Sequence, residues 1–152
     1  MVARVGGLLG AEVLREARKI QPGPPLEYPI QTVSEVLDFG SRWGSQKRFH
    51  VGITTVLINR EIAMAAVPGE PLHLLQEEWK AQAEVRYPLF FGYTCSTAGD
   101  WPGYIPDLRS AAHGGYGADS DIEIGAGETI VQHHLKNLYG LLGMWKDKPG
   151  QP

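Results

Sequence analysis

The chain has 152 residues, of which 43% are hydrophobic and 20% are charged, so it is the size of one ordinary globular domain and can bury a core. Its formal net charge is -3 and its 14 basic residues are spread along the chain, which argues against a nucleic acid as partner. A single cysteine, Cys95, excludes an internal disulfide and a cysteine-rich zinc knuckle.

Residues 2–20 are predicted to form an amphipathic surface helix, because apolar side chains recur there at helical spacing. The apolar stretch is too short, and Glu12 and Glu16 follow too soon, for a signal peptide to be favoured, so the compartment stays open. No stretch approaches the ~20 apolar residues of a membrane span, and we expect no transmembrane segment. A helix of this kind at the start is equally consistent with the later part of a longer protein.

A proline-rich connector ends this helix, and a series of strands and helices is predicted after it. Residues 30–39 suit a half-exposed strand. Three further segments are so apolar that we expect strands covered on both faces of a mixed sheet, namely residues 49–59, 61–67 and 87–95. Helical spacing predicts two more helices, marked by Leu72, Leu75, Trp79 and Ala83, and by Val131, Leu135, Leu138, Leu142 and Trp145.

This order of elements predicts an α/β or α+β fold, in which amphipathic helices flank a mixed β-sheet. We expect residues 1–143 to form a single globular domain and residues 144–152 to form a polar tail. Residues 96–128 are predicted to be a loop, far longer than the roughly 12 to 15 residues at which structureless loops become uncommon. Trp101, Tyr104 and Tyr116 argue against disorder in that loop, so its length indicates a function.

Four short motifs stand in and before this loop: "VPGEP" at residues 67–71, "GYIP" at 103–106, "GGYG" at 114–117 and "GAGE" at 125–128. In this order and spacing they resemble the later half of the catalytic domain of the neutral/alkaline (non-lysosomal) ceramidases and their bacterial relatives. The resemblance covers most of the chain. It implies a zinc-dependent amidohydrolase that cleaves a lipid-like amide, an N-acyl sphingoid base, into a fatty acid and a sphingoid base.

By the same resemblance, Glu70 and Tyr104 are ligands of the catalytic zinc, and Tyr116 is a catalytic residue in the pocket. The chemistry suits these residue types. Zinc lowers the pKa of bound water to roughly 7, so that hydroxide can attack an amide carbonyl at neutral pH. A tyrosine hydroxyl can bond the resulting oxyanion. A short turn after a buried strand would hold the Glu70 carboxylate on a rigid support.

The resemblance also has departures. The two histidine ligands of the family lie in the earlier half of its catalytic domain, which has no counterpart in this chain, whereas catalytic zinc usually takes three protein ligands plus water. We therefore expect little or no activity from this chain alone, with the histidines supplied by an upstream segment or a partner chain. Asp107 and Gly117 also replace a threonine and an acidic residue of the family. Full-length relatives are often secreted or membrane-associated.

Each of these residues has a structural alternative. Glu70 after Pro-Gly suits a turn or the first turn of a helix, where negative charge is favoured. Tyr104 and Tyr116 suit loop anchors that bury a ring. The alternative function is a non-catalytic binding or interaction module that keeps the scaffold and uses the aromatic loop. The "GAGE" motif predicts a capping turn with Glu128 near the helix dipole, because the rest of a phosphate-binding motif is missing.

The other histidines and the cysteine are interpreted as structural. His133 and His134 diverge by about 100° on a helix, so they do not readily face one metal ion, and we expect them at the surface or an edge. His73 has no partner at ligand spacing, whereas His113 lies near Tyr116 and is a candidate for the pocket. Cys95 in an aromatic strand is predicted to lie in the core.

Overall fold

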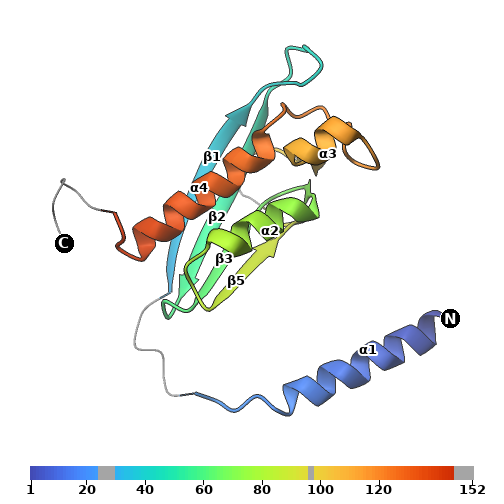
Figure 1. Ribbon diagram of the computed structural model, residues 1–152, viewed down its shortest axis with the longest axis vertical. Coiled ribbons are helices and arrows are strands. Elements are labelled where there is room, and N and C mark those ends of the chain that lie inside the picture. The colour runs from blue at the N-terminus through green and yellow to red at the C-terminus, as the bar shows by residue number, and fades with distance from the viewer. Residues whose placement is uncertain (24–29, 96–97, 146–152) are drawn as a thin grey trace.

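A computed structural model describes residues 1–23, 30–95 and 98–145 (Figure 1). The helices and strands of this part are, in order, α1 (Val2–Ala17), β1 (Gln31–Phe39), β2 (Phe49–Ile58), β3 (Ile62–Ala66), β4 (Glu70–Pro71), α2 (His73–Gln82), β5 (Tyr87–Phe91), β6 (Tyr104–Ile105), α3 (Leu108–His113) and α4 (Ala126–Leu141). The predicted combination of helices and a mixed sheet is confirmed. Because the antiparallel strands precede most of the helices, the fold is of the α+β kind.

The main sheet has four strands in the order β1-β2-β3-β5. β1 pairs antiparallel with β2 along its whole length, and β2 pairs antiparallel with β3 across a tight turn. Asn59 and Arg60 form that turn with positive φ angles of 52° and 59°, a conformation that suits the twist of a hairpin. β5 joins β3 in parallel, because α2 carries the chain back across the sheet between these two strands.

The helices α2 and α4 cover one face of this sheet and lie side by side on it (Figure 1). Strand side chains alternate between buried and partly exposed, as a sheet covered on one face requires. The largest side chains of the resulting core include Phe49, Ile53, Leu57, Leu75, Trp79, Ile130 and Leu138. α2 and α4 thus anchor the sheet whose strand ends carry the candidate site.

The opposite face of the sheet carries apolar side chains that are open to solvent. Val36 on β1 is 47% exposed, and Leu89 and Phe91 on β5 are 36% and 44% exposed. The prediction that the apolar strands are covered on both faces is therefore wrong for the described part of the chain. The outward positions of β3 and β5 are apolar, but the two covering helices lie on the other face of the sheet.

The predicted N-terminal helix is confirmed as α1, which stands apart from the rest of the fold (Figure 1). None of its residues is buried. Its charged side chains pair along the helix, with Arg15 bonded to Glu12 and Lys19 to Glu16. Within the described ranges, none of the helices has both the length and the apolar character needed to cross a bilayer.

Part of the segment predicted as one long loop is regular structure, so that prediction needs correction. It contains β6 and the short helix α3, and β4 precedes α2. Asp107 begins α3 as its N-cap, with its carboxylate accepting a hydrogen bond from the Ser110 N–H at 2.9 Å. Elements of two and six residues are too short to show a hydrophobic period. Of the predicted polar tail, residues 146–152 lie outside the described residues.

His134 and Cys95 also differ from expectation. The His134 side chain is fully buried, with its Nδ1 atom 2.8 Å from the Thr55 hydroxyl and its ring edge-on to Trp79. Burial lowers its pKa to about 3, with a smaller contribution from His133. His133 does lie at an edge, half-buried beside β1. Cys95 is exposed, because β5 ends before it.

Candidate functional site

Glu70 and Tyr104, far apart in the sequence, are direct partners in a second, two-stranded sheet. β4 and β6 pair in parallel, with Glu70 opposite Tyr104 and Pro71 opposite Ile105. The Glu70 N–H donates to the Gly103 carbonyl at 2.8 Å, and the Leu72 N–H donates to the Ile105 carbonyl at 3.0 Å. The structure therefore brings two of the three predicted site residues to one place on a backbone-paired support.

Gly69 explains why the apolar run of β3 stops at Pro-Gly before the carboxylate. Its φ angle is +93°, in the left-handed region that favours glycine. A Cβ atom at this position would lie 2.6 Å from the Gly103 carbonyl oxygen and 2.9 Å from the Pro102 ring. Glycine is thus required for the close approach of the two chain segments, and that approach places Glu70 against Tyr104.

Tyr93 contacts the Glu70 carboxylate, and the sequence did not predict this contact. Its backbone has a φ angle of 56°, which is uncommon for a residue other than glycine. Its N–H donates to the Gly69 carbonyl at 2.8 Å, and its hydroxyl donates to Glu70 Oε2 at 2.5 Å. Unusual backbone conformations cluster at functional sites. Nothing in the sequence indicates this contact except that an aromatic residue follows glycine just after β5.

Tyr116 joins the site through Tyr104. The two rings pack edge to face, with their centroids 5.4 Å apart. Gly117 permits this packing, because a Cβ atom there would lie 2.7 Å from the Tyr104 ring. The glycine that departs from the family pattern thus has a structural reason in this chain. Tyr116 itself is 89% exposed, so its ring is not buried as a loop anchor would be.

The tyrosine hydroxyls hold their protons firmly. Hydrogen bonding to Tyr116, then to Glu70, together with the negative charge of Glu70, raises the pKa of Tyr104 far above its ordinary value of 10. The hydrogen bond to Glu70 likewise raises the pKa of Tyr93. At neutral pH these phenols are therefore proton donors gathered around one carboxylate.

Glu70, Tyr93 and Tyr104 face a cavity of about 350 Å³. Its lining residues are Glu70, Pro71, Leu72, His73, Gln76, Phe90, Gly92, Tyr93 and Tyr104. Apolar walls with a few polar groups are typical of small-molecule sites. His73, interpreted from the sequence as structural, contributes to this wall. His113 instead lines a neighbouring cavity, so the structure separates it from Glu70 and Tyr104.

The donor atoms of this site fit part of a zinc coordination shell. The Glu70 carboxylate and the Tyr104 hydroxyl are oxygen donors that face one cavity from a rigid support. One carboxylate oxygen of Glu70, Oε2, already accepts the Tyr93 hydroxyl. In the described residues, no three His, Cys, Asp or Glu side chains gather in a way that would hold a metal ion. Glu70 and Tyr104 could thus supply at most two of the ligands of a zinc ion.

Asp107, the other departure from the family pattern, has no place in this cavity. Its side chain is 4% exposed and accepts hydrogen bonds from the N–H and the hydroxyl of Ser110. Although its burial alone would raise the pKa of the carboxyl, these hydrogen bonds hold it below its usual value. Its role is to start α3.

Comparison of the chain with family models, curated proteins and solved structures returns no match.

Proposed function

We propose that this chain is part of a zinc-dependent amidohydrolase of the neutral ceramidase type, acting on a lipid-like amide. The observation that carries the proposal is the pairing of Glu70 with Tyr104 at the mouth of one cavity. The motif resemblance assigns a metal to these two residues, and their convergence is what a shared metal ion requires. Two side chains that faced unrelated surfaces would have excluded this function.

In this proposal Glu70 and Tyr104 hold the metal ion, which when bound supplies an activated water and polarises the amide carbonyl. Tyr93 orients the Glu70 carboxylate through its hydrogen bond, as residues behind a metal ligand commonly do. Tyr116 is close enough to Tyr104 to donate its phenolic proton to an oxyanion at the same place. Hydrolysis breaks the C–N bond, and the carbonyl carbon gains the water oxygen while the nitrogen gains a proton.

The remaining ligands would come from an upstream segment or from a partner chain, so this chain alone is expected to be inactive. The open apolar face of the main sheet supports such an arrangement. Val36, Leu89 and Phe91 leave a surface that favours burial against another polypeptide. β5 on this face runs directly into Tyr93, so a polypeptide docked there would lie near the cavity.

The test measures zinc content and hydrolysis of N-acylsphingosine by this chain, alone and together with the upstream segment. Glu70→Gln removes the negative charge of the proposed metal ligand and nearly keeps the shape of the side chain. Glu77→Gln, at an exposed position of α2, is the matched control. We expect Glu70→Gln to lower zinc uptake and to abolish hydrolysis by the assembled form, while Glu77→Gln leaves both unchanged. Unchanged zinc uptake by Glu70→Gln in the assembled form would exclude the metal role.

A second candidate function is a non-catalytic module that binds a lipid-like ligand or a partner. Three exposed aromatic side chains around the site favour it: Tyr93, Trp101 and Tyr116 are 67%, 54% and 89% exposed. Binding of a non-hydrolysable N-acylsphingosine analogue by this chain alone, unaffected by a zinc chelator, would support this function. Binding that requires zinc would support the amidohydrolase.

A further inference from the structure

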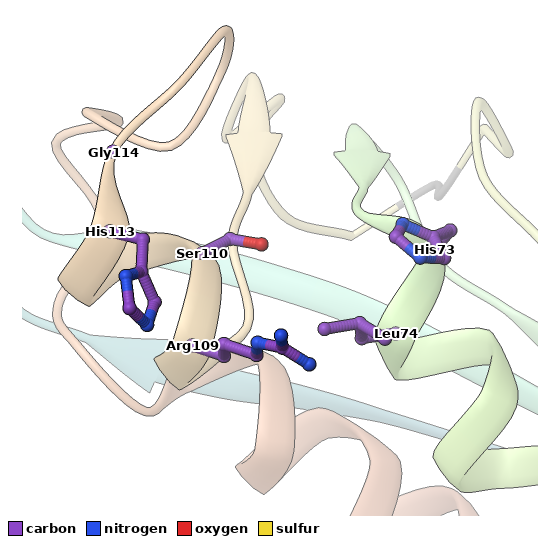
Figure 2. Close-up of a pocket in the computed structure, with 6 residues that line it drawn as sticks. All are labelled: His73, Leu74, Arg109, Ser110, His113 and Gly114. Atoms are coloured by element: carbon purple, nitrogen blue, oxygen red, sulfur yellow. The ribbon is translucent and has the colours of Figure 1, made fainter.

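A second cavity, of about 420 Å³, adjoins the candidate site and plays no part in the function proposed above. It lies between the start of α2 and the short helix α3 (Figure 2). Its lining residues are His73, Leu74, Arg109, Ser110, His113 and Gly114. His73 also lines the cavity of Glu70 and Tyr104, so the two cavities share one wall.

The polar side chains of this second cavity favour an anion. Arg109 carries a permanent positive charge, two imidazoles and a hydroxyl accompany it, and no carboxylate lines the wall. In the described ranges the Arg109 guanidinium makes no ion pair and no hydrogen bond. Other arginines are engaged: Arg48 pairs with Asp38, and Arg42 donates to two backbone carbonyls. Arg109 thus has its hydrogen-bond donors available for a ligand.

The short helix α3 is held firmly, which fixes where Arg109 can reach. Its first N–H, that of Leu108, donates to Glu128 of α4 at 2.6 Å. Arg42 donates to the Ala111 carbonyl at 3.0 Å. Arg109 and His113 are four residues apart on α3, so they share one side of the helix. Figure 2 shows the Arg109 side chain extending toward Leu74 at the start of α2, with the Ser110 hydroxyl pointing into the same gap.

We propose that this cavity is a subsite for the anionic group, a carboxylate or phosphate, of an amide whose scissile bond lies in the adjoining cavity. Arg109 makes the charged contact in this subsite. Guanidinium binds both of these anions through paired hydrogen bonds. The shared wall at His73 allows one molecule to occupy both cavities. The substrate class is then an N-acyl amide that carries an anion on its amine part, such as an N-acyl amino acid, in preference to a neutral N-acyl sphingoid base.

The identity of the ligand as an amide substrate rests on the proposed amidohydrolase function, but anion binding at Arg109 needs no metal. The two can therefore be tested separately. The probes are inorganic phosphate, N-octanoylglycine and the neutral N-octanoylethanolamine, each titrated at constant ionic strength into this chain and followed by backbone amide NMR shifts. The variants are Arg109→Gln and, as a matched loss of charge at the C-cap of helix α1, Arg18→Gln.

We expect phosphate and N-octanoylglycine to shift the amide signals of His73, Ser110 and His113. Arg109→Gln should weaken N-octanoylglycine binding at least about tenfold, as expected for loss of a charge-assisted hydrogen bond, whereas Arg18→Gln should not change it. N-octanoylethanolamine should bind more weakly and equally to all three proteins.

Equal binding of the neutral and anionic amides would overturn the proposal, as would equal losses in the two variants. Phosphate binding without N-octanoylglycine binding would overturn the substrate subsite and leave only an anion site. These outcomes are independent of zinc uptake by Glu70→Gln in the assembled form, so failure of the subsite and failure of the amidohydrolase function are distinguishable.

Discussion

The buried imidazole of His134 makes the stability of this fold sensitive to mild acid. The side chain is completely buried. Among the described residues, its Nδ1 atom pairs with the Thr55 hydroxyl and its Nε2 atom has no hydrogen-bond partner. Protonation would place a positive charge against the rings of Trp79 and Phe90. Burial therefore lowers the pKa from 6.5 to about 3 in the folded state.

Because the pKa of His134 is lower in the folded chain than in the unfolded chain, acid destabilises the fold. Between pH 6.5 and pH 3 the unfolded chain binds a proton at His134 and the folded chain does not, so acidification favours unfolding. In this range each unit of pH below 6.5 costs about 1.4 kcal/mol, so the loss between pH 7 and pH 5 is about 2 kcal/mol. A loss of this size is a large part of the stability of a typical domain.

Urea unfolding at pH 7, 6 and 5 measures this loss, with tryptophan fluorescence as the probe, to which the buried Trp79 beside His134 contributes. His134→Gln removes the titration while an amide remains beside Thr55. We expect the free energy of unfolding of this variant to change by about 2 kcal/mol less between pH 7 and pH 5 than that of the original protein. His133→Gln, a change at the neighbouring half-buried imidazole, should leave the His134 contribution in place.

Equal losses of stability between pH 7 and pH 5 in His134→Gln and in the original protein would refute the contribution of a buried, neutral His134. A second measurement guards against a variant that fails to fold. In the original protein, the NMR signals of the His134 ring should stay constant from pH 7 to pH 5 while the protein is folded. A titration of that ring with its midpoint near 6.5 would contradict the buried, neutral imidazole.

Two further predictions concern the candidate site. Tyr93→Phe removes the hydrogen bond to Glu70 Oε2, so zinc affinity of the assembled form should fall about 10- to 100-fold, measured by competition with a chelator; an unchanged affinity would contradict the orienting role of Tyr93. Gly117→Ala places a Cβ atom 2.7 Å from the Tyr104 ring at a φ angle of +79°, so it should destabilise the fold by about 1 to 3 kcal/mol in thermal unfolding. Gly6→Ala, where the added atom meets nothing within 4 Å, is the control and should not destabilise.

The long elements could be predicted from the sequence because each carries its own period. Helical spacing located α1, α2 and α4, and the apolar runs located β2, β3 and β5, since these patterns depend only on which residues face the core. The short elements had no such pattern. β4 and β6 form because the chain after Gly69 makes backbone hydrogen bonds with the distant residues Gly103 and Ile105. α3 begins where Asp107 caps the Ser110 N–H and where the Leu108 N–H donates to the distant Glu128.

The candidate site was predicted in part. Glu70 and Tyr104 were selected by their motifs, and the structure places them side by side, whereas the role of Tyr93 was not foreseen. The position of Tyr93 depends on a left-handed backbone conformation, and no residue pattern around Tyr93 predicts that conformation. The cavity around Arg109 was missed for a similar reason, because α3 meets α2 only through tertiary contacts.

The sequence by itself determined which long elements form. These are an amphipathic first helix, apolar strands and two helices with one apolar side each, together with an aromatic segment rich in glycine. Only the tertiary structure decided that His134 is enclosed in the core, that one face of the sheet stays open, and that Glu70 and Tyr104 share a cavity. Local periodicity reports whether a residue can be buried. Which partner buries it depends on contacts between segments far apart in the chain, and a single sequence does not record those contacts.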